Sequence, residues 1–262
     1  MLHDLSGAAR AYIVFLALML GAALGSFLNC AAWRTVRGES FLKGRSRCPE
    51  CGRTLGAAEL VPLFGWLFLR GRCRGCGKPI PARYPLTELG FALLTLACLL
   101  RFDVSLLFVR NLVFLACLYF LTLTDLDAQV IPDGCLLAAA LVWGASAPFL
   151  LPSWREALAS LLAGLVFGGA LLGLSLLMDR ALGRESMGGG DIKLFALTGL
   201  YLGFIGTLFA LLLSCAAGIL LALAMKKKRS QAFPFGPAIA AADAAMLLWG
   251  GGLVEWYLRL LG

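Results

Sequence analysis

The stretch Leu158–Met178 reads LASLLAGLVFGGALLGLSLLM and contains no charged residue. A helix needs roughly 20 predominantly apolar residues to cross about 30 Å of hydrocarbon, and this stretch meets that length. The whole chain has the same character, since 60% of its 262 residues are hydrophobic and only 15% are charged. A soluble domain could not hide so much apolar surface from water. The sequence therefore predicts a polytopic membrane protein.

Further apolar stretches of this kind predict an all-α fold of about eight transmembrane helices. The stretch Ile192–Leu202 is short, and only Gly203 separates it from the next one. It is either one arm of a tight helical hairpin or the first part of one long helix, so seven spans is the alternative to eight. The first stretch is long and lacks the features of a removable signal peptide, so we expect it to remain. The candidate spans are Ala11–Ala32, Leu86–Leu100, Leu106–Leu123, Cys135–Leu151, Leu158–Met178, Ile192–Leu202, Ile205–Met225 and Pro237–Leu261.

Basic residues indicate which loops face the cytoplasm. Residues 34–83 carry eleven Lys and Arg residues against three acids, and a second basic cluster, Lys226–Arg229, follows the seventh candidate span. Cytoplasmic loops are enriched in Lys and Arg. Eight spans place both clusters on the cytoplasmic side, whereas seven place them on opposite sides. We therefore interpret the net charge of +8 as a topology signal, and no aromatic-interleaved basic stripe indicates a nucleic-acid partner.

The basic segment 34–83 contains two Cys-x-x-Cys pairs, Cys48–Cys51 and Cys73–Cys76. Paired knuckles of this kind are typical of a tetrahedral structural zinc site. The glycines Gly52 and Gly77, which follow the pairs, suit the tight turns of such knuckles. Two disulfides or metal-free thiols are the alternatives, although a reducing cytoplasm disfavours disulfides. Four cysteines would fill the coordination shell, so we expect a structural role for the zinc and no catalytic one.

Acidic residues gather in the two other loops that the topology places in the cytoplasm. Residues 124–134 contain Asp125, Asp127 and Asp133, and residues 179–191 end in Gly188-Gly189-Gly190-Asp191. Acids at the membrane boundary are costly and usually face a cavity, a partner or a functional path. Helix capping is the alternative for Asp133. The glycines before Asp191 would let an extended substrate backbone approach its carboxylate.

Two carboxylates brought together from separate loops can perform aspartic-protease chemistry. At close range they cannot both ionise, so one retains its proton. The charged partner then takes a proton from water, while the protonated partner hydrogen-bonds the scissile carbonyl. This chemistry needs neither a metal nor a histidine, and the single histidine of the chain is His3, near the N-terminus.

Several motifs in order along the chain resemble the prepilin leader peptidases and N-methyltransferases, bacterial members of the Gly-x-Gly-Asp aspartic proteases. The resemblance covers nearly the whole chain, with two departures at Ala128, where the family often has His, and at Leu60-Val61-Pro62-Leu63, where it often has Asn-Ile-Pro-Leu. The matching motifs are Gly25-Ser26-Phe27-Leu28-Asn29, the four-cysteine loop, Arg83-Tyr84-Pro85-Leu86-Thr87-Glu88, Asp125-Leu126-Asp127, Ile131-Pro132-Asp133, Met187-Gly188-Gly189-Gly190-Asp191-Ile192-Lys193 and Pro234-Phe235-Gly236-Pro237.

The resemblance implies a two-step enzyme in the bacterial inner membrane, with its catalytic loops on the cytoplasmic side. It would cleave the basic leader from type IV prepilins or pseudopilins and then methylate the new N-terminus, commonly Phe, with S-adenosylmethionine. By motif match the catalytic pair is Asp125 and Asp191, with Asp127 and Asp133 as substitutes for the first position. The implied segments are a first transmembrane helix (1–33), a cytoplasmic cysteine-rich domain (34–85) and a transmembrane peptidase core (86–262).

The methyltransferase activity rests on the resemblance alone, since the sequence has no Gly-x-Gly-x-x-Gly cradle. We expect it near Gly25–Asn29, Arg34 and Glu88. Asn29 could instead simply bond a neighbouring helix, and Glu88 could equally be an interfacial residue. Asp243, inside the last span, has no assigned role. A proton-coupled transporter and an inactive zinc-ribbon scaffold are the alternatives from other classes, but a transporter would more often show an inverted repeat and acids near the midplane.

Overall fold

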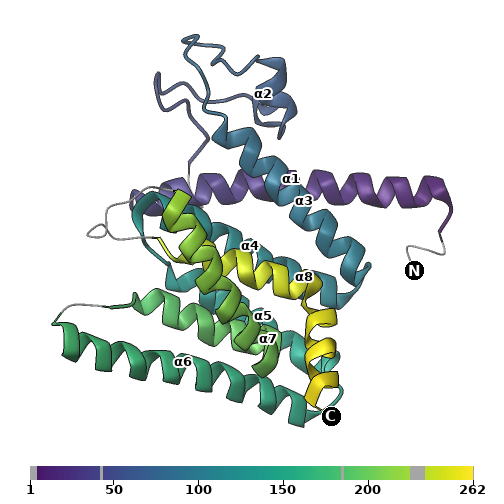
Figure 1. Cartoon of the computed structure of the whole chain (residues 1–262). Helices are drawn as coiled ribbons and strands as arrows, with labels where there is room; N and C mark the ends of the chain where they lie inside the picture. The colour runs from purple at the N-terminus through teal and green to yellow at the C-terminus, as the bar shows by residue number, and fades with distance from the viewer. Residues whose placement is uncertain (1–4, 42–43, 184–185, 225–233, 262) are drawn as a thin grey trace. The chain divides into compact units, whose positions relative to one another are not determined.

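The structure, a computed structural model, describes residues 5–41, 44–183, 186–224 and 234–261 (Figure 1). In this part of the chain seven helices are long and apolar enough to cross a membrane. The chain divides into two compact units, Met1–Phe108 and Val109–Gly262. The all-α membrane fold expected from the sequence is confirmed. The basic cluster Lys226–Arg229 and His3 lie outside the described residues.

Two crossing helices form the membrane part of the first unit (Figure 1). Helix α1 (Gly7–Val36) packs against α3 (Arg83–Phe102). The crossing is close because α1 has glycines there: a Cβ at Gly21 would lie 2.7 Å from Ala92 Cα, and one at Gly25 would lie 2.9 Å from Thr87 O. Gly25 of the Gly25–Asn29 motif therefore has a packing role, since it lets the two backbones approach.

The segment between α1 and α3 carries the cysteines and only short helices. These are η2 (Ala57–Leu60) and α2 (Phe64–Phe68), together with the isolated bridges Arg47–Thr54 and Arg72–Pro79. Trp66 of α2 donates its indole N–H to Ile80 O at 3.2 Å and so ties α2 to the chain that leads into α3.

Five helices make up the second unit: α4 (Leu106–Ala128), which begins at the unit boundary, α5 (Asp133–Leu150), α6 (Trp154–Leu182), α7 (Gly189–Ala224) and α8 (Gly236–Leu261). Tyr201 of α7 connects three of them. Its ring stacks on Phe114 of α4 with centroids 4.0 Å apart, and its hydroxyl donates to Ala139 O of α5 at 2.8 Å. Helix α6 packs tightly on α7, where a Cβ at Gly199 would lie 2.4 Å from Gly164 N.

Helix α7 is interrupted at Gly203, which has φ 67° and ψ −173°. This conformation is outside the helical region and favours glycine. Figure 1 shows that the arm after Gly203 turns back from the arm before it. The hairpin alternative is therefore the one that the structure adopts, and the two arms of α7 account for the difference between seven helices and the expected eight.

Several helices extend into segments that the sequence analysis placed in loops, and α4 and α6 do so at their C-terminal ends. Residues 124–128 belong to α4, which ends where Gln129 adopts φ 56°. Residues 179–182 belong to α6, which ends at the left-handed Gly183. The loops are therefore shorter than expected, and Asp125 lies in the last turns of a helix. The apolar stretches did not extend to these helix ends because the final turns of α4 and α6 are polar.

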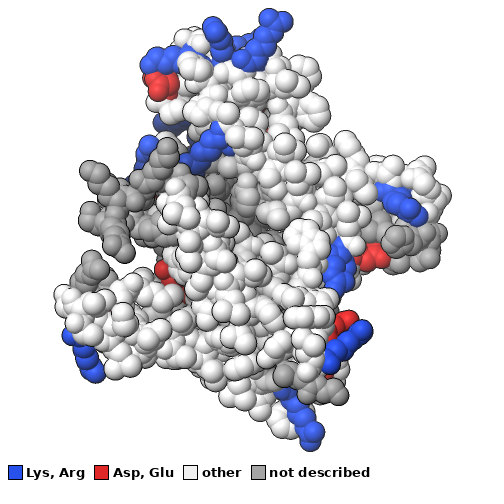
Figure 2. Space-filling model, viewed as in Figure 1, with Lys and Arg blue, Asp and Glu red and all other residues white. Residues whose placement is uncertain are grey.

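The outward faces of the helices are apolar. Leu165 of α6, Leu220 of α7 and Phe149 of α5 are 71%, 68% and 79% exposed. Figure 2 shows large white areas over the helices, while Lys and Arg side chains gather over the cysteine loop and near helix ends. Contiguous apolar surface of this extent is unstable in water, and hydrocarbon is the solvent that suits it.

Candidate functional site

Asp125 is held by the beginning of α8. It is 5% exposed, and its Oδ2 accepts a hydrogen bond from Gly236 N–H at 2.9 Å. The first N–H groups of a helix have no partner within the helix and carry partial positive charge, so they suit a carboxylate. A Cβ at Gly236 would lie 2.8 Å from Asp125 Oδ2. Glycine is therefore required for this contact.

Asp191 lies in the first turn of α7, half-buried, and interacts electrostatically with Asp125. Gly190 sets its position, because a Cβ there would lie 2.6 Å from Ile131 Cβ. Gly190 thus lets the beginning of α7 pack directly against Ile131. The sequence analysis assigned the glycines before Asp191 to substrate approach, and the structure adds this packing role for Gly190.

The other two candidate acids have different surroundings. Asp127 is exposed near the end of α4, two residues from the buried Asp125 and so on a different helix face. Asp133 is exposed in the first turn of α5 and forms an ion pair with Lys193 Nζ at 2.7 Å. These surroundings favour the helix-capping role for Asp133 and leave Asp125 as the acid that lies beside Asp191.

Sequence reasoning noted the motif Pro234–Pro237 but gave it no function. In the structure Gly236 N–H binds Asp125. The Phe235 ring packs against Gly218 of α7, where an added Cβ would lie 2.8 Å from the ring. The signal available in the sequence was a glycine at the beginning of an apolar stretch, followed by Pro237. Proline is favoured in the first turn of a helix, and the preceding glycine leaves room for a carboxylate.

The four cysteines of the first unit form a compact cluster. The Sγ atoms of Cys48, Cys51, Cys73 and Cys76 all lie within 4.8 Å of one another. A tetrahedral zinc with Zn–S bonds of about 2.3 Å separates its sulfurs by roughly 3.8 Å. All nine cysteines of the chain are free thiols. The cluster therefore has the donor set and the compactness of a metal site.

The two knuckles repeat the same backbone pattern. Cys48 N–H donates to Arg53 O and Gly52 N–H donates to Cys48 O, both at 2.9 Å. Cys73 N–H and Gly77 N–H make the equivalent bonds at the same distance, to Lys78 O and Cys73 O. Backbone N–H groups of Cys76 and Gly75 directed at Cys73 Sγ lower the pKa of Cys73 to about 6. The fold of the second knuckle thus favours a thiolate at Cys73, the form that binds metals.

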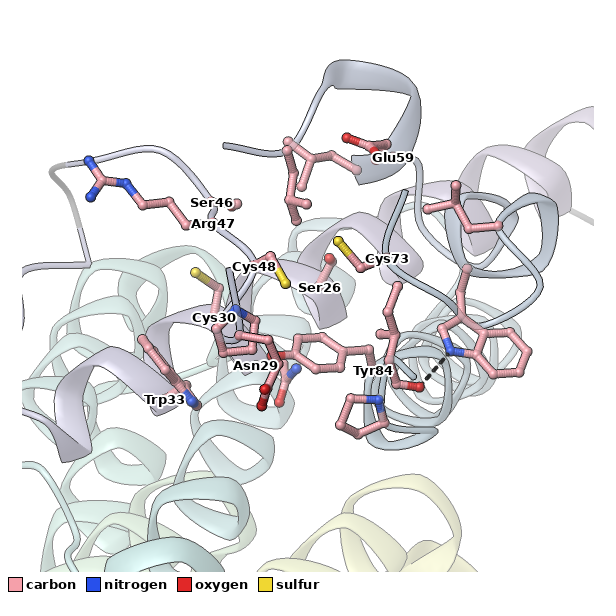
Figure 3. Close-up of a pocket in the computed structure, with 18 of the residues that line it drawn as sticks. Ser26, Asn29, Cys30, Trp33, Ser46, Arg47, Cys48, Glu59, Cys73 and Tyr84 are labelled. Carbon is pink, nitrogen blue, oxygen red and sulfur yellow. Dashed lines mark hydrogen bonds between the residues drawn. The ribbon is translucent and has the colours of Figure 1, made fainter. Parts of the chain in front are cut away.

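A cavity of about 550 Å³ lies in the first unit beside the cysteines. In the view of Figure 3, Cys30, Asn29 and Trp33 of α1 lie to the left of the Tyr84 ring, and Cys48 and Cys73 lie above it. Arg47 extends away from the other labelled residues (Figure 3). The volume falls within the 300–1,000 Å³ range of small-molecule sites.

The polar residues expected near a methyltransferase site all line this cavity. Asn29 Oδ1 accepts from Arg83 Nε at 3.2 Å, which agrees with the helix-bonding alternative for Asn29. Arg34 donates to Arg45 O at 3.2 Å. Glu88 is buried, and its Oε2 accepts from Leu63 N–H at 2.6 Å. Because Leu63 has φ 62°, Glu88 stabilises a strained turn beside the cavity.

Comparison with known proteins identifies the family. A model of the bacterial peptidase A24 N-terminal domain matches residues 19–102, and one of the type IV leader peptidase family matches residues 112–223. A prepilin leader peptidase/N-methyltransferase of Bacillus subtilis (strain 168) is 34% identical over 248 residues, covering 92% of this chain and 96% of the relative. Proteins of the same name from Aeromonas hydrophila and Pseudomonas putida are 39% and 33% identical, covering 82% and 96% of this chain and 74% and 96% of their own lengths.

The chain belongs to the prepilin leader peptidase/N-methyltransferase family. The resemblance inferred from the motifs is thereby confirmed. No solved structure matches the chain. Each family model lies within one structural unit: the N-terminal domain and its cysteines in Met1–Phe108, and the leader peptidase, with Asp125 and Asp191, in Val109–Gly262.

Proposed function

We propose that this prepilin peptidase family member removes the leader peptide from type IV prepilins or pseudopilins, with Asp125 and Asp191 as its catalytic pair. The observation that carries the proposal is the meeting of these two carboxylates at the ends of α4 and α7. Asp125 is buried and oriented by Gly236 N–H, and Asp191 is half-buried beside it. Asp127 and Asp133 are exposed, and Asp133 is paired with Lys193.

The two acids would share the work of general base and general acid. The ionised carboxylate takes a proton from a water molecule as the water oxygen attacks the scissile carbonyl carbon. The protonated carboxyl donates its proton to the carbonyl oxygen, which gives a neutral tetrahedral intermediate. Collapse of this intermediate breaks the C–N bond, and the leaving amine takes up the proton that the base removed from water. As the C=O bond re-forms, one hydroxyl of the intermediate returns its proton to the carboxylate that acted as the acid. Both carboxyl groups are then ready for another cycle.

The charge distribution supports placing this chemistry at the cytoplasmic face of a bacterial inner membrane. The segment 34–83 is strongly basic, and cytoplasmic segments are enriched in Lys and Arg. A substrate leader that carries positive charge would stay on the same side. An apolar segment of the substrate would remain in the lipid beside helices whose outward faces are apolar.

The four-cysteine cluster would hold a structural zinc ion. Four thiolates complete a tetrahedral shell, so no position is left for water or substrate. The metal would join two knuckles that the chain connects only through the segment 52–72, which contains η2 and α2. It would thereby shape the wall of the cavity that Cys48 and Cys73 line.

The cavity of the first unit is the site we assign to S-adenosylmethionine. Its lining combines aromatic rings, including Trp33 and Tyr84, with buried polar groups such as Asn29 and Glu88. Aromatic faces and carboxylates suit a sulfonium cation and an adenine ring. When bound, the cofactor supplies an electrophilic methyl group for the new N-terminal amine. The residues around it would exclude water and orient that amine.

The proton-coupled transporter has less support, because the relatives covering nearly the whole chain carry the name of a peptidase. The proposed function is tested by incubating the purified chain in detergent with a prepilin, with and without S-adenosylmethionine. Mass spectrometry should find the leaderless product in both reactions, with one added methyl group, about 14 Da, only where the donor is present. An intact prepilin in both reactions would refute the peptidase assignment.

A further inference from the structure

Helix α8 carries a carboxyl group in an unusual place. Asp243 is fully buried, and its Oδ2 lies 2.6 Å from Thr198 Oγ1 of α7. Its Oδ1 has no hydrogen-bond partner among the described residues. Cys117 of α4 is near enough to interact with it electrostatically. Neither the acid nor its partner belongs to the peptidase mechanism described above.

The hydrogen bonds around Thr198 indicate which partner donates. Thr198 Oγ1 lies 3.0 Å from Leu194 O as well as 2.6 Å from Asp243 Oδ2. A threonine hydroxyl has one proton and can donate it to only one of these oxygens. Both contacts become hydrogen bonds when the hydroxyl donates to Leu194 O and a protonated Asp243 donates to Thr198 Oγ1. A neutral acid also avoids an unpaired charge inside the membrane.

The position of this pair along the helices connects it with Asp125 and Asp191. Thr198 follows Asp191 by seven residues, and Asp243 follows Gly236 by the same interval. Seven residues are almost two helical turns, so in each helix the two positions share a face about 10.5 Å apart. The first arm of α7 and α8 run in the same direction (Figure 1). The hydrogen bond between Thr198 and Asp243 therefore joins the two helices about two turns beyond Asp191 and Gly236, on the helix faces that carry those residues.

We propose that Asp243, as a neutral acid hydrogen-bonded to Thr198, is a positioning residue that fixes the register of α8 against the first arm of α7. Gly236 begins α8 and holds Asp125, while Asp191 begins α7. Sliding of one helix along the other would change the separation of the two catalytic carboxyls. Misplacement of catalytic groups by about 1 Å can lower a rate about 100-fold. This inference rests on the proposed peptidase function.

Apolar side chains alone would determine the register of α8 against the first arm of α7 less specifically than this hydrogen bond does. Ala240 and Ala242 are buried neighbours of Asp243 in α8. Small apolar groups slide past one another at little cost, whereas a short hydrogen bond between two buried polar groups is satisfied at one register only. In hydrocarbon no water is available to replace the lost partner.

The test compares four single variants and the double variant Asp243→Leu/Thr198→Val of the full-length chain in prepilin cleavage. Asp243→Asn keeps an N–H that can donate to Thr198 Oγ1, so we expect kcat within about 3-fold of the wild-type value. Asp243→Leu and Thr198→Val remove the bond and should lower kcat about 10- to 100-fold, with KM nearly unchanged. Thr207→Val is the matched control, because Thr207 is also a buried threonine of α7 but donates only to Gly203 O in its own helix.

The outcomes distinguish the positioning role from its alternatives. The positioning role is supported if Asp243→Leu and Thr198→Val both lower kcat, and if the double variant loses no more than either single variant. Asp243→Asn should then keep a kcat near the wild-type value. Unchanged kcat in Thr198→Val, or an equal loss in Thr207→Val, overturns it. If Asp243→Leu fails to fold, as judged by its thermal unfolding midpoint, the kcat values of Thr198→Val and Asp243→Asn still test the positioning role. Wild-type protein that does not cleave would instead refute the proposed function.

Discussion

Gly236 and Gly190 determine where the two proposed catalytic acids lie, because each occupies a position with no room for a side chain. A Cβ at Gly236 would lie 2.8 Å from Asp125 Oδ2, and one at Gly190 would lie 2.6 Å from Ile131 Cβ. Contacts this short between a Cβ and a neighbouring atom force one of the two groups to move. At the residue scale, the geometry of the site therefore depends on glycines that carry no chemistry themselves.

Gly236→Ala should displace the Asp125 carboxylate and break its hydrogen bond to the backbone of α8. We expect prepilin cleavage to fall at least about 10-fold, because the carboxylate loses its fixed orientation. Initial cleavage rates measured with purified protein check this. The control is Gly252→Ala on the same helix, where nothing lies within 4 Å of the added Cβ. Equal activity of the two variants would contradict the positioning role of Gly236.

At the scale of helices and loops, the sequence indicated every membrane-spanning helix that the structure describes, but not where several of them begin or end. The apolar stretch Leu106–Leu123 predicted α4, yet the helix continues through the polar residues Thr124–Ala128. Helix ends there depend on a single residue, Gln129, adopting a left-handed conformation. Single-sequence patterns carry little information about such choices.

The sequence also could not show which groups contact the two proposed catalytic acids, for a different reason. The contact between Asp125 and Gly236 joins residues far apart in the chain, and hydropathy reports only how apolar each segment is. The motifs did single out Asp125, Asp191 and Gly236 as residues of interest. Which groups touch one another is fixed by helix packing, as at the Gly190–Ile131 contact.

The cysteine loop allows a prediction at the element scale. We expect about one zinc ion per chain in protein purified without chelator, since four thiols form one tetrahedral site. Cys48→Ser should lower both the zinc content and the thermal unfolding midpoint of the loop, because the metal joins the two knuckles. Elemental analysis and differential scanning fluorimetry measure these. Cys215→Ser, at an exposed position of α7, should change neither quantity. Wild-type protein free of metal would contradict the zinc assignment.

For the whole molecule, the division into two units parallels the two activities. The proposed peptidase acids belong to Val109–Gly262, whereas the cavity assigned to the methyl donor is lined entirely by residues of Met1–Phe108. Loss of the methyl-donor site should therefore leave leader removal intact, and loss of the peptidase acids should leave methyl-donor binding intact. Lipid is the solvent for both units, as the exposed apolar helix faces indicate.

Tyr84→Ala should weaken binding of S-adenosylmethionine at least about 10-fold, because the ring lies within the cavity and its loss removes one aromatic face. Equilibrium dialysis with radiolabelled donor measures this without relying on enzyme turnover. Tyr12→Ala, which removes an exposed ring elsewhere on α1, serves as the control. Asp191→Asn should bind the donor normally. Normal binding by Tyr84→Ala would contradict the cavity assignment.

The central claim is that Asp125 and Asp191 act together on one peptide bond. The most direct measurement is the rate of leader removal, followed by product mass, in four Asp→Asn variants at positions 125, 127, 133 and 191. Asn preserves the size of each side chain but cannot act as a base. We predict that Asp125→Asn and Asp191→Asn lower the cleavage rate at least about 1,000-fold. The cleavage rates of Asp127→Asn and Asp133→Asn should stay within about 5-fold of the wild-type rate. Full cleavage by either of the first two variants would contradict the account.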